Sequence, residues 1–150
     1  MYSTLRILSI VSSVDLSCAV GTFAASQPVE KIATKLAGVW NEGIRADLTC
    51  DNKTYHHAFS LSADGLVLTK RYLVPYEGNY GRVSEERYRV LYGDDNSLML
   101  FREGESFENR ETGDKVIRQL IVESEKIYTW RVYGTPREQR AAAGGLRCMS

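Results

Sequence analysis

The chain has 150 residues, of which 19 are basic and 19 acidic, so its formal net charge at neutral pH is zero. With 43% hydrophobic residues, this length is one domain's worth and is enough to bury a core of its own. The balanced charge provides no long-range field that would attract nucleic acid, so we expect no nucleic-acid partner.

The first 25 residues have the pattern of a secretory signal peptide. Arg6 supplies one positive charge, an apolar run follows at 7–11, and small residues lead to a cleavage site near Ala25. The apolar run is too short to span a bilayer permanently, so we expect no stable membrane anchor and a periplasmic or secreted protein. The alternatives are a lipid anchor at Cys18 and an uncleaved cytosolic N-terminus.

Removal of that segment leaves two cysteines, Cys50 and Cys148. An even pair in an exported chain predicts one disulfide, which would join the end of the first strand to the C-terminal tail. The alternative is two unrelated buried thiols. Two cysteines do not make a structural zinc site, which needs four ligands, and we expect no metal.

A lead-in at residues 26–37, with one or two helical turns, precedes a β-rich domain at 38–150. Alternating apolar and polar residues separated by turn residues such as Asp64-Gly65 predict short strands, and 75–81 reads as a loop. Beyond Gly134-Thr135-Pro136 the tail is polar and rich in Ala and Gly until Cys148. The expected strands cover residues 39–50, 55–62, 66–74, 82–92, 97–101, 115–124 and 127–133.

Seven or eight strands at this spacing, with no strong helix between them, predict an all-β fold. We expect an antiparallel up-and-down β-barrel of about eight strands, because closure of a barrel removes exposed sheet edges. Trp40, at the start of the first strand, is expected to fill one end of the barrel.

The Gly38-Val39-Trp40 motif resembles the Gly-x-Trp that opens the first strand of lipocalins and of fatty-acid-binding proteins. It is also similar to the start of small periplasmic barrels that inhibit metalloproteases, although the cysteine pattern departs from theirs. The likeness to lipocalins implies a lipocalin-like barrel with a basic side chain over the Trp40 ring, for which Arg131 and Arg137 are candidates.

Two sets of residues are candidates for binding a ligand inside such a barrel. Tyr55, His57 and Phe59 fall on one side of the second strand, and we expect this side to face inward. Arg131 and Tyr133 are similar to the Arg-x-Tyr with which fatty-acid-binding proteins hold a carboxylate.

The inward orientation of Arg131 conflicts with the hydrophobic pattern of the same strand. If Arg131 and Tyr133 point inward, then Tyr128, Trp130 and Val132 point outward and expose apolar area. The apolar set is therefore an alternative occupant of the interior.

Two further groups of side chains can be interpreted as surface features. Tyr76 and Tyr80 in the 75–81 loop are candidates for a partner-binding surface. The acidic and basic residues around Glu85-Glu86 suit cross-strand charge pairs on a solvated face.

No catalytic motif is apparent: the chain has no Gly-x-Ser-x-Gly frame, no phosphate-binding loop and no His-Glu-x-x-His. We therefore expect an exported, non-enzymatic barrel without a cofactor that binds a small apolar or amphipathic ligand. The alternative is a protein-binding module that acts through its loops, either an inhibitor of an extracellular enzyme or a secreted host-interaction factor. Large side chains filling the interior would favour this alternative.

Overall fold

A computed structural model of the chain describes residues 27–43, 48–79, 81–106, 108, 113–133 and 143–149. The predicted signal segment, Tyr80 and Arg137 lie outside these residues. None of the helices in the described ranges is long and apolar enough to cross a membrane.

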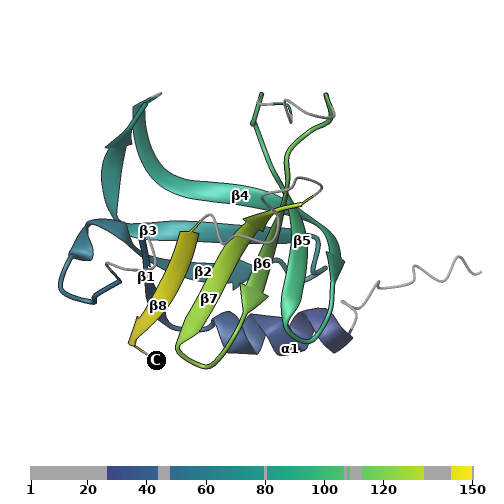
Figure 1. Ribbon diagram of the computed structural model, residues 1–150, viewed down its shortest axis with the longest axis horizontal. Helices are drawn as coiled ribbons and strands as arrows, with labels where there is room; N and C mark the ends of the chain where they lie inside the picture. Colours follow the sequence, from purple (N-terminus) through teal and green to yellow (C-terminus); the bar gives the residue numbers. More distant parts are fainter. Residues whose placement is uncertain are drawn as a thin grey trace, which may run out of the picture.

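Eight antiparallel strands close into a barrel in which each strand pairs with its neighbour in sequence and the last pairs with the first. This arrangement confirms the predicted all-β, up-and-down barrel, and Figure 1 shows the strands wrapping around one interior. The strands are β1 (Val39–Gly43), β2 (His56–Leu61), β3 (Val67–Gly78), β4 (Gly81–Gly93), β5 (Ser97–Arg102), β6 (Ile117–Val122), β7 (Ile127–Val132) and β8 (Ala143–Met149), and a 3-10 helix, η2 (Lys53–Tyr55), precedes β2.

The helix α1 (Gln27–Leu36) lies across one end of the barrel, as Figure 1 shows. It is ten residues long and so exceeds the one or two turns expected for the lead-in. Val29, Ile32 and Leu36 share one helical face and are buried, Ile32 completely. The helix therefore closes this end of the barrel with an apolar lid.

Trp40 is completely buried beneath this lid, as predicted. Its indole Nε1 donates to the backbone oxygen of Leu36 at 2.9 Å, and the Tyr128 ring meets it edge-on. The guanidinium of Arg147 lies 4.6 Å from its ring centroid. The expectation of Arg131 in that role is therefore wrong, because pairing of β8 with β1 sets Arg147 opposite Trp40. The other candidate, Arg137, lies outside the described residues.

The predicted loop at 75–81 is largely strand, so that prediction is wrong. β3 continues to Gly78 and pairs with β4 from Tyr76 onward, after an irregular register between Arg71 and Tyr76. Pro75 falls within this irregular stretch, where its missing N–H removes no regular ladder hydrogen bond. The turn itself is confined to the end of the hairpin, where Gly81 has a φ of +111°.

The polar tail contains β8, a strand that the sequence pattern does not predict. Gly145 shows why this strand contains glycine and where the strand packs. A Cβ at Gly145 would lie 2.0 Å from a ring carbon of Tyr128. The predicted Cys50–Cys148 disulfide is present and ties this closing strand to the segment before η2. Close packing inside the barrel therefore requires the glycine at position 145.

The half of the barrel nearest α1 is filled by large side chains. Trp40 and Tyr128 form one cluster with leucines from three strands, and all of these side chains are almost fully buried. The interior therefore opens at the opposite end of the barrel. The cluster's apolar members from the strands are Trp40, Leu68, Tyr88, Leu98, Leu100, Leu120, Val122, Tyr128 and Trp130.

Candidate functional site

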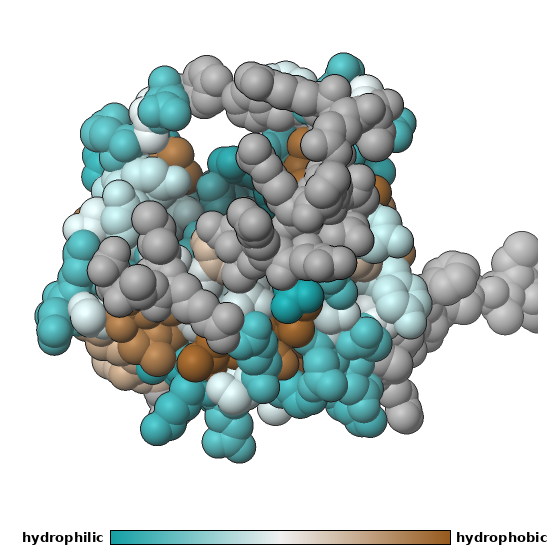
Figure 2. Space-filling view, in the orientation of Figure 1, coloured by the Kyte–Doolittle hydropathy of each residue, from teal (hydrophilic) through white to brown (hydrophobic). Residues whose placement is uncertain are grey.

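The end of the barrel opposite α1 holds a cavity of about 240 Å³. In the space-filling view the upper part of the molecule is hollowed, and the surface seen inside the hollow is hydrophilic (Figure 2). We call this space the mouth cavity. It is lined by Glu42, Tyr72, Tyr76, Glu86, Tyr88, Arg118, Trp130, Arg131, Val132 and Ala143.

Glu42, at the end of β1, is the acceptor at the floor of the mouth cavity. Lys70 Nζ donates to one carboxylate oxygen at 2.7 Å, and Tyr128 Oη and Trp130 Nε1 both donate to the other at 2.7 Å. Burial acts to raise the pKa of Glu42, but the charge of Lys70 and the hydrogen bonds that Lys70 and Tyr128 donate act against it, and the pKa is lowered. Glu42 is therefore an ionised carboxylate held by three donors from two strands, β3 and β7.

Glu86 is the second interior carboxylate. Tyr88 Oη donates to it at 2.8 Å, the guanidinium of Arg102 lies at 2.8 Å, and Lys70 Nζ lies at 3.8 Å. Arg118 forms its own two-pronged pair with Glu105. Among the described residues, the three acids around the mouth cavity are thus each paired with a base: Glu42 with Lys70, Glu86 with Arg102 and Glu105 with Arg118.

Two phenols of the cavity wall, those of Tyr72 and Tyr88, remain protonated. Burial, and next the charge of Glu86, raise the pKa of Tyr72 and of Tyr88 far above their ordinary value. These hydroxyls can therefore donate hydrogen bonds to a ligand or to a neighbour, while their rings supply apolar surface.

Arg131 breaks this balance of charge at the cavity wall. Its Nε is buried and has no hydrogen-bond partner, and none of the ion pairs among the described residues includes its guanidinium. Glu42, Glu86 and Glu105 are matched by Lys70, Arg102 and Arg118, so within the part of the chain that the structure describes Arg131 is a surplus cation beside the cavity. The cavity therefore favours an anionic group.

Of the predicted ligand residues on β2, His57 and Phe59 face the interior and Tyr55 does not. His57 is completely buried and hydrogen-bonded, and Phe59 packs edge-on against it. Tyr55 is 44% exposed because it ends η2, one residue before the strand alternation begins, and its ring packs on Tyr76. None of the three lines the mouth cavity.

On β7 the apolar side chains occupy the interior, as the alternative interpretation of this strand predicted: Tyr128 and Trp130 are buried. Tyr133 is 55% exposed, so it does not form an inward pair with Arg131. Arg131 nevertheless reaches the mouth cavity from the end of its strand, and Tyr76 lines the cavity from β3. The structure thus brings Arg131 and Tyr76 together, and leaves Tyr133 outside.

Sequence reasoning missed the interior charges. The pairs Arg71–Glu85 and Arg87–Glu103 do lie on the solvated face, as expected, but Glu86 points inward. Lys70 shows the available signal, because it shares the parity of the buried Leu68 and Tyr72 and is itself only 2% exposed. A lysine on an apolar face of a strand indicates a buried partner of opposite charge.

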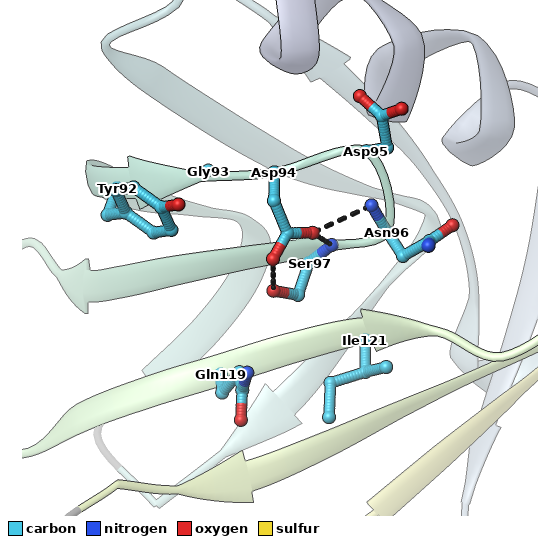
Figure 3. A pocket seen from close by; sticks show the side chains of 8 residues that line it. All are labelled: Tyr92, Gly93, Asp94, Asp95, Asn96, Ser97, Gln119 and Ile121. Carbon is cyan, nitrogen blue, oxygen red and sulfur yellow. Dashed lines mark hydrogen bonds between the residues drawn. The ribbon is translucent and has the colours of Figure 1, made fainter.

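A second hollow, of about 520 Å³, lies outside the barrel beside the turn between β4 and β5. Figure 3 shows that the Asp94 carboxylate is used by this turn: it accepts from the backbone of Asn96 and from the backbone and hydroxyl of Ser97. Asp95 pairs with Lys31 of α1. The acids here hold the turn and the helix in place.

No group of three or more His, Cys, Asp or Glu side chains that could hold a metal ion occurs within the ranges that the structure describes.

Fold and cavity together define a small closed β-barrel with a polar, aromatic-lined mouth. Its architecture is compatible with that of lipocalins and fatty-acid-binding proteins. Comparison with family models, curated proteins and solved structures gives no match.

Proposed function

We propose that the protein is an exported, non-enzymatic barrel that binds a small amphipathic anion in the mouth cavity. The observation that carries the proposal is the surplus cation: Arg131 lies beside interior acid–base pairs that are otherwise matched. A carboxylate on the ligand would complete the charge balance through charge-assisted hydrogen bonds.

The walls of the cavity indicate the rest of the ligand. The rings of Tyr72, Tyr76, Tyr88 and Trp130 offer stacking surface around the space. The volume of about 240 Å³ is below the roughly 300–1,000 Å³ of sites for drug-sized ligands. A single planar ring that carries an acid group suits it, whereas the packed half of the barrel leaves no room for a long apolar chain.

A specific observation also supports the alternative, a protein-binding module. Leu73 and Val74, in the irregular part of β3, are both more than half exposed, and so is Met149. These side chains line an apolar groove of about 380 Å³ beside the disulfide. Exposed apolar residues gathered beside a groove are typical of protein contact surfaces, and an extracellular enzyme or a host protein would be the partner.

Isothermal titration with three ring compounds separates the two functions. Benzoate, benzamide and benzylamine share one ring and differ in charge, and we expect the protein to bind benzoate in preference to the other two. Arg131→Gln is expected to weaken benzoate binding by about tenfold or more, because a hydrogen bond to a charged group contributes about 1.5–3 kcal/mol.

Arg89→Gln is the matched control, because Arg89 is exposed on the outer face of β4 and the change in net charge is the same. It should leave benzoate binding unchanged. Equal binding of the three compounds, or equal weakening by the two variants, would contradict the proposed site and leave the protein-binding function as the better explanation.

Export is part of the same proposal, and the Cys50–Cys148 disulfide supports it because such bonds persist in oxidising compartments. N-terminal sequencing of the protein from the cell envelope or the medium should begin near Ala25 or Ser26. An intact Met1 on protein from the cytoplasm would refute the signal peptide.

A further inference from the structure

The interior of the barrel contains a continuous chain of hydrogen-bonding groups beneath the mouth cavity. His57 Nδ1 lies 2.8 Å from the backbone oxygen of Tyr55, and His57 Nε2 lies 2.8 Å from Tyr128 Oη. Tyr128 Oη in turn lies 2.7 Å from a carboxylate oxygen of Glu42. The chain therefore runs from a backbone carbonyl through an imidazole and a phenol to a carboxylate.

Both ends of this chain only accept hydrogen bonds, so its three contacts require three protons. A neutral His57 carries one ring proton, which the Tyr55 carbonyl assigns to Nδ1. Tyr128 carries one hydroxyl proton, for which His57 Nε2 and the Glu42 carboxylate compete. Two protons serve three contacts, and one short contact is left without a proton.

The missing proton has one place to go. Both carboxylate oxygens of Glu42 already accept hydrogen bonds, from Lys70 and from Tyr128 and Trp130, and its pKa is lowered, so this group does not supply the missing proton at pH 7. Burial and then the Glu42 charge raise the pKa of Tyr128, so its phenol keeps its proton. His57 Nε2 is the basic atom that remains, and a proton there would donate to Tyr128 while Tyr128 donates to Glu42.

The surroundings of His57 decide when that proton is taken up. β1 contributes Glu42, β3 contributes Lys70 and the Tyr72 ring, and His56 precedes it on β2. Burial and then the charge of Lys70 lower the pKa of His57 to about 4, against the opposing charge of Glu42. The His57 ring is therefore neutral at pH 7, and the series of hydrogen-bonding groups remains one proton short.

We propose that Glu42, Tyr128 and His57 form one buried proton-binding site. On acidification the site takes one proton from solvent onto His57 Nε2, and no other bond is made or broken. The three side chains then change together, from a chain with one proton too few to a fully bonded imidazolium–phenol–carboxylate series. This site does not depend on the anion proposed for the mouth cavity.

Nuclear magnetic resonance of the full chain tests this proposal directly. The imidazole nitrogens of His57, the ring Cζ of Tyr128 and the carboxyl carbon of Glu42 are followed from pH 7 to pH 3. His56→Gln assigns the signals, because the chain has two histidines. We expect a neutral His57 with its proton on Nδ1 at pH 7, and a single midpoint near pH 4 shared by all three signals.

Tyr128→Phe removes the phenol that joins the two ends, and we expect it to lower the His57 midpoint by about one pH unit, a tenfold loss of proton affinity. Tyr92→Phe makes the same change on an exposed residue and should leave the midpoint unchanged. If Tyr128→Phe does not fold, the presence or absence of a shared midpoint in the wild-type protein still tests the proposal. An imidazolium already present at pH 7, or a His57 that titrates while Tyr128 and Glu42 do not respond, would overturn the proposal.

Discussion

Replacement of Glu42 by glutamine is expected to lower the free energy of unfolding by about 3–5 kcal/mol, the range for breaking a buried ion pair. The change leaves Lys70, which is only 2% exposed, with Glu86 at 3.8 Å as its remaining acid among the described residues. The ionised acceptor shared by Tyr128 and Trp130 is lost at the same time. Urea unfolding at pH 7, followed by circular dichroism, measures the effect.

Glu85→Gln is the matched control for this prediction. Glu85 neighbours Glu86 on β4 but pairs on the outer face with Arg71, whose side chain is 70% exposed. Exposed pairs of this kind contribute about 0–1 kcal/mol. If the two glutamine variants lost the same stability, the interior carboxylate would not hold the barrel together.

Trp40→Ala is expected to cost about 3–5 kcal/mol, the range for deletion of a buried aromatic side chain. The indole fills the space beneath α1, and the guanidinium of Arg147 lies over its ring. That cation–π contact contributes about 0.5–2 kcal/mol and would be lost together with the packing. Denaturant unfolding of the variant measures the sum.

Tyr133→Ala provides the comparison, since it removes an aromatic side chain that is 55% exposed. A surface substitution of this kind changes stability by about 0.5 kcal/mol or less. A similarly small loss for Trp40→Ala would mean that the indole does not support the closed end of the barrel.

The fold follows from local patterns that the sequence shows directly. Four local features each predict what the structure contains: the alternation in β2 and the first half of β3, the Asp64-Gly65 turn, the position of Trp40, and the pair of cysteines that follows the predicted signal segment. These features depend on neighbours in sequence or on a single chemical rule, and so they can be read without knowing the tertiary contacts.

The features that could not be predicted depend on contacts between distant strands. β8 looks like a loose tail because Gly145 disfavours a strand, yet the Tyr128 ring requires a glycine at that position. Arg147 covers Trp40 only because β8 pairs with β1. Closure of the barrel determines both.

The candidate site was predicted only in part for a related reason. Alternation divides a strand into two faces but does not say which one points inward when both carry charges, as β4 does around Glu86. Arg131 was identified, but the balance of charge that leaves it unmatched appears only when Glu42, Lys70 and Arg102 are placed in one interior.

The most direct test of the mouth cavity as the binding site is the response of the two indole N–H signals in the nuclear magnetic resonance spectrum. The chain has two tryptophans. Trp130 donates to Glu42 at the cavity wall, whereas Trp40 donates to Leu36 at the closed end. One spectrum therefore reports on both ends of the barrel.

Addition of benzoate should shift the Trp130 indole signal and leave the Trp40 signal in place, and Arg131→Gln should suppress that shift at the same benzoate concentration. Benzoate that shifts neither signal, or shifts the Trp40 signal alone, would contradict the assignment of the mouth cavity as the binding site.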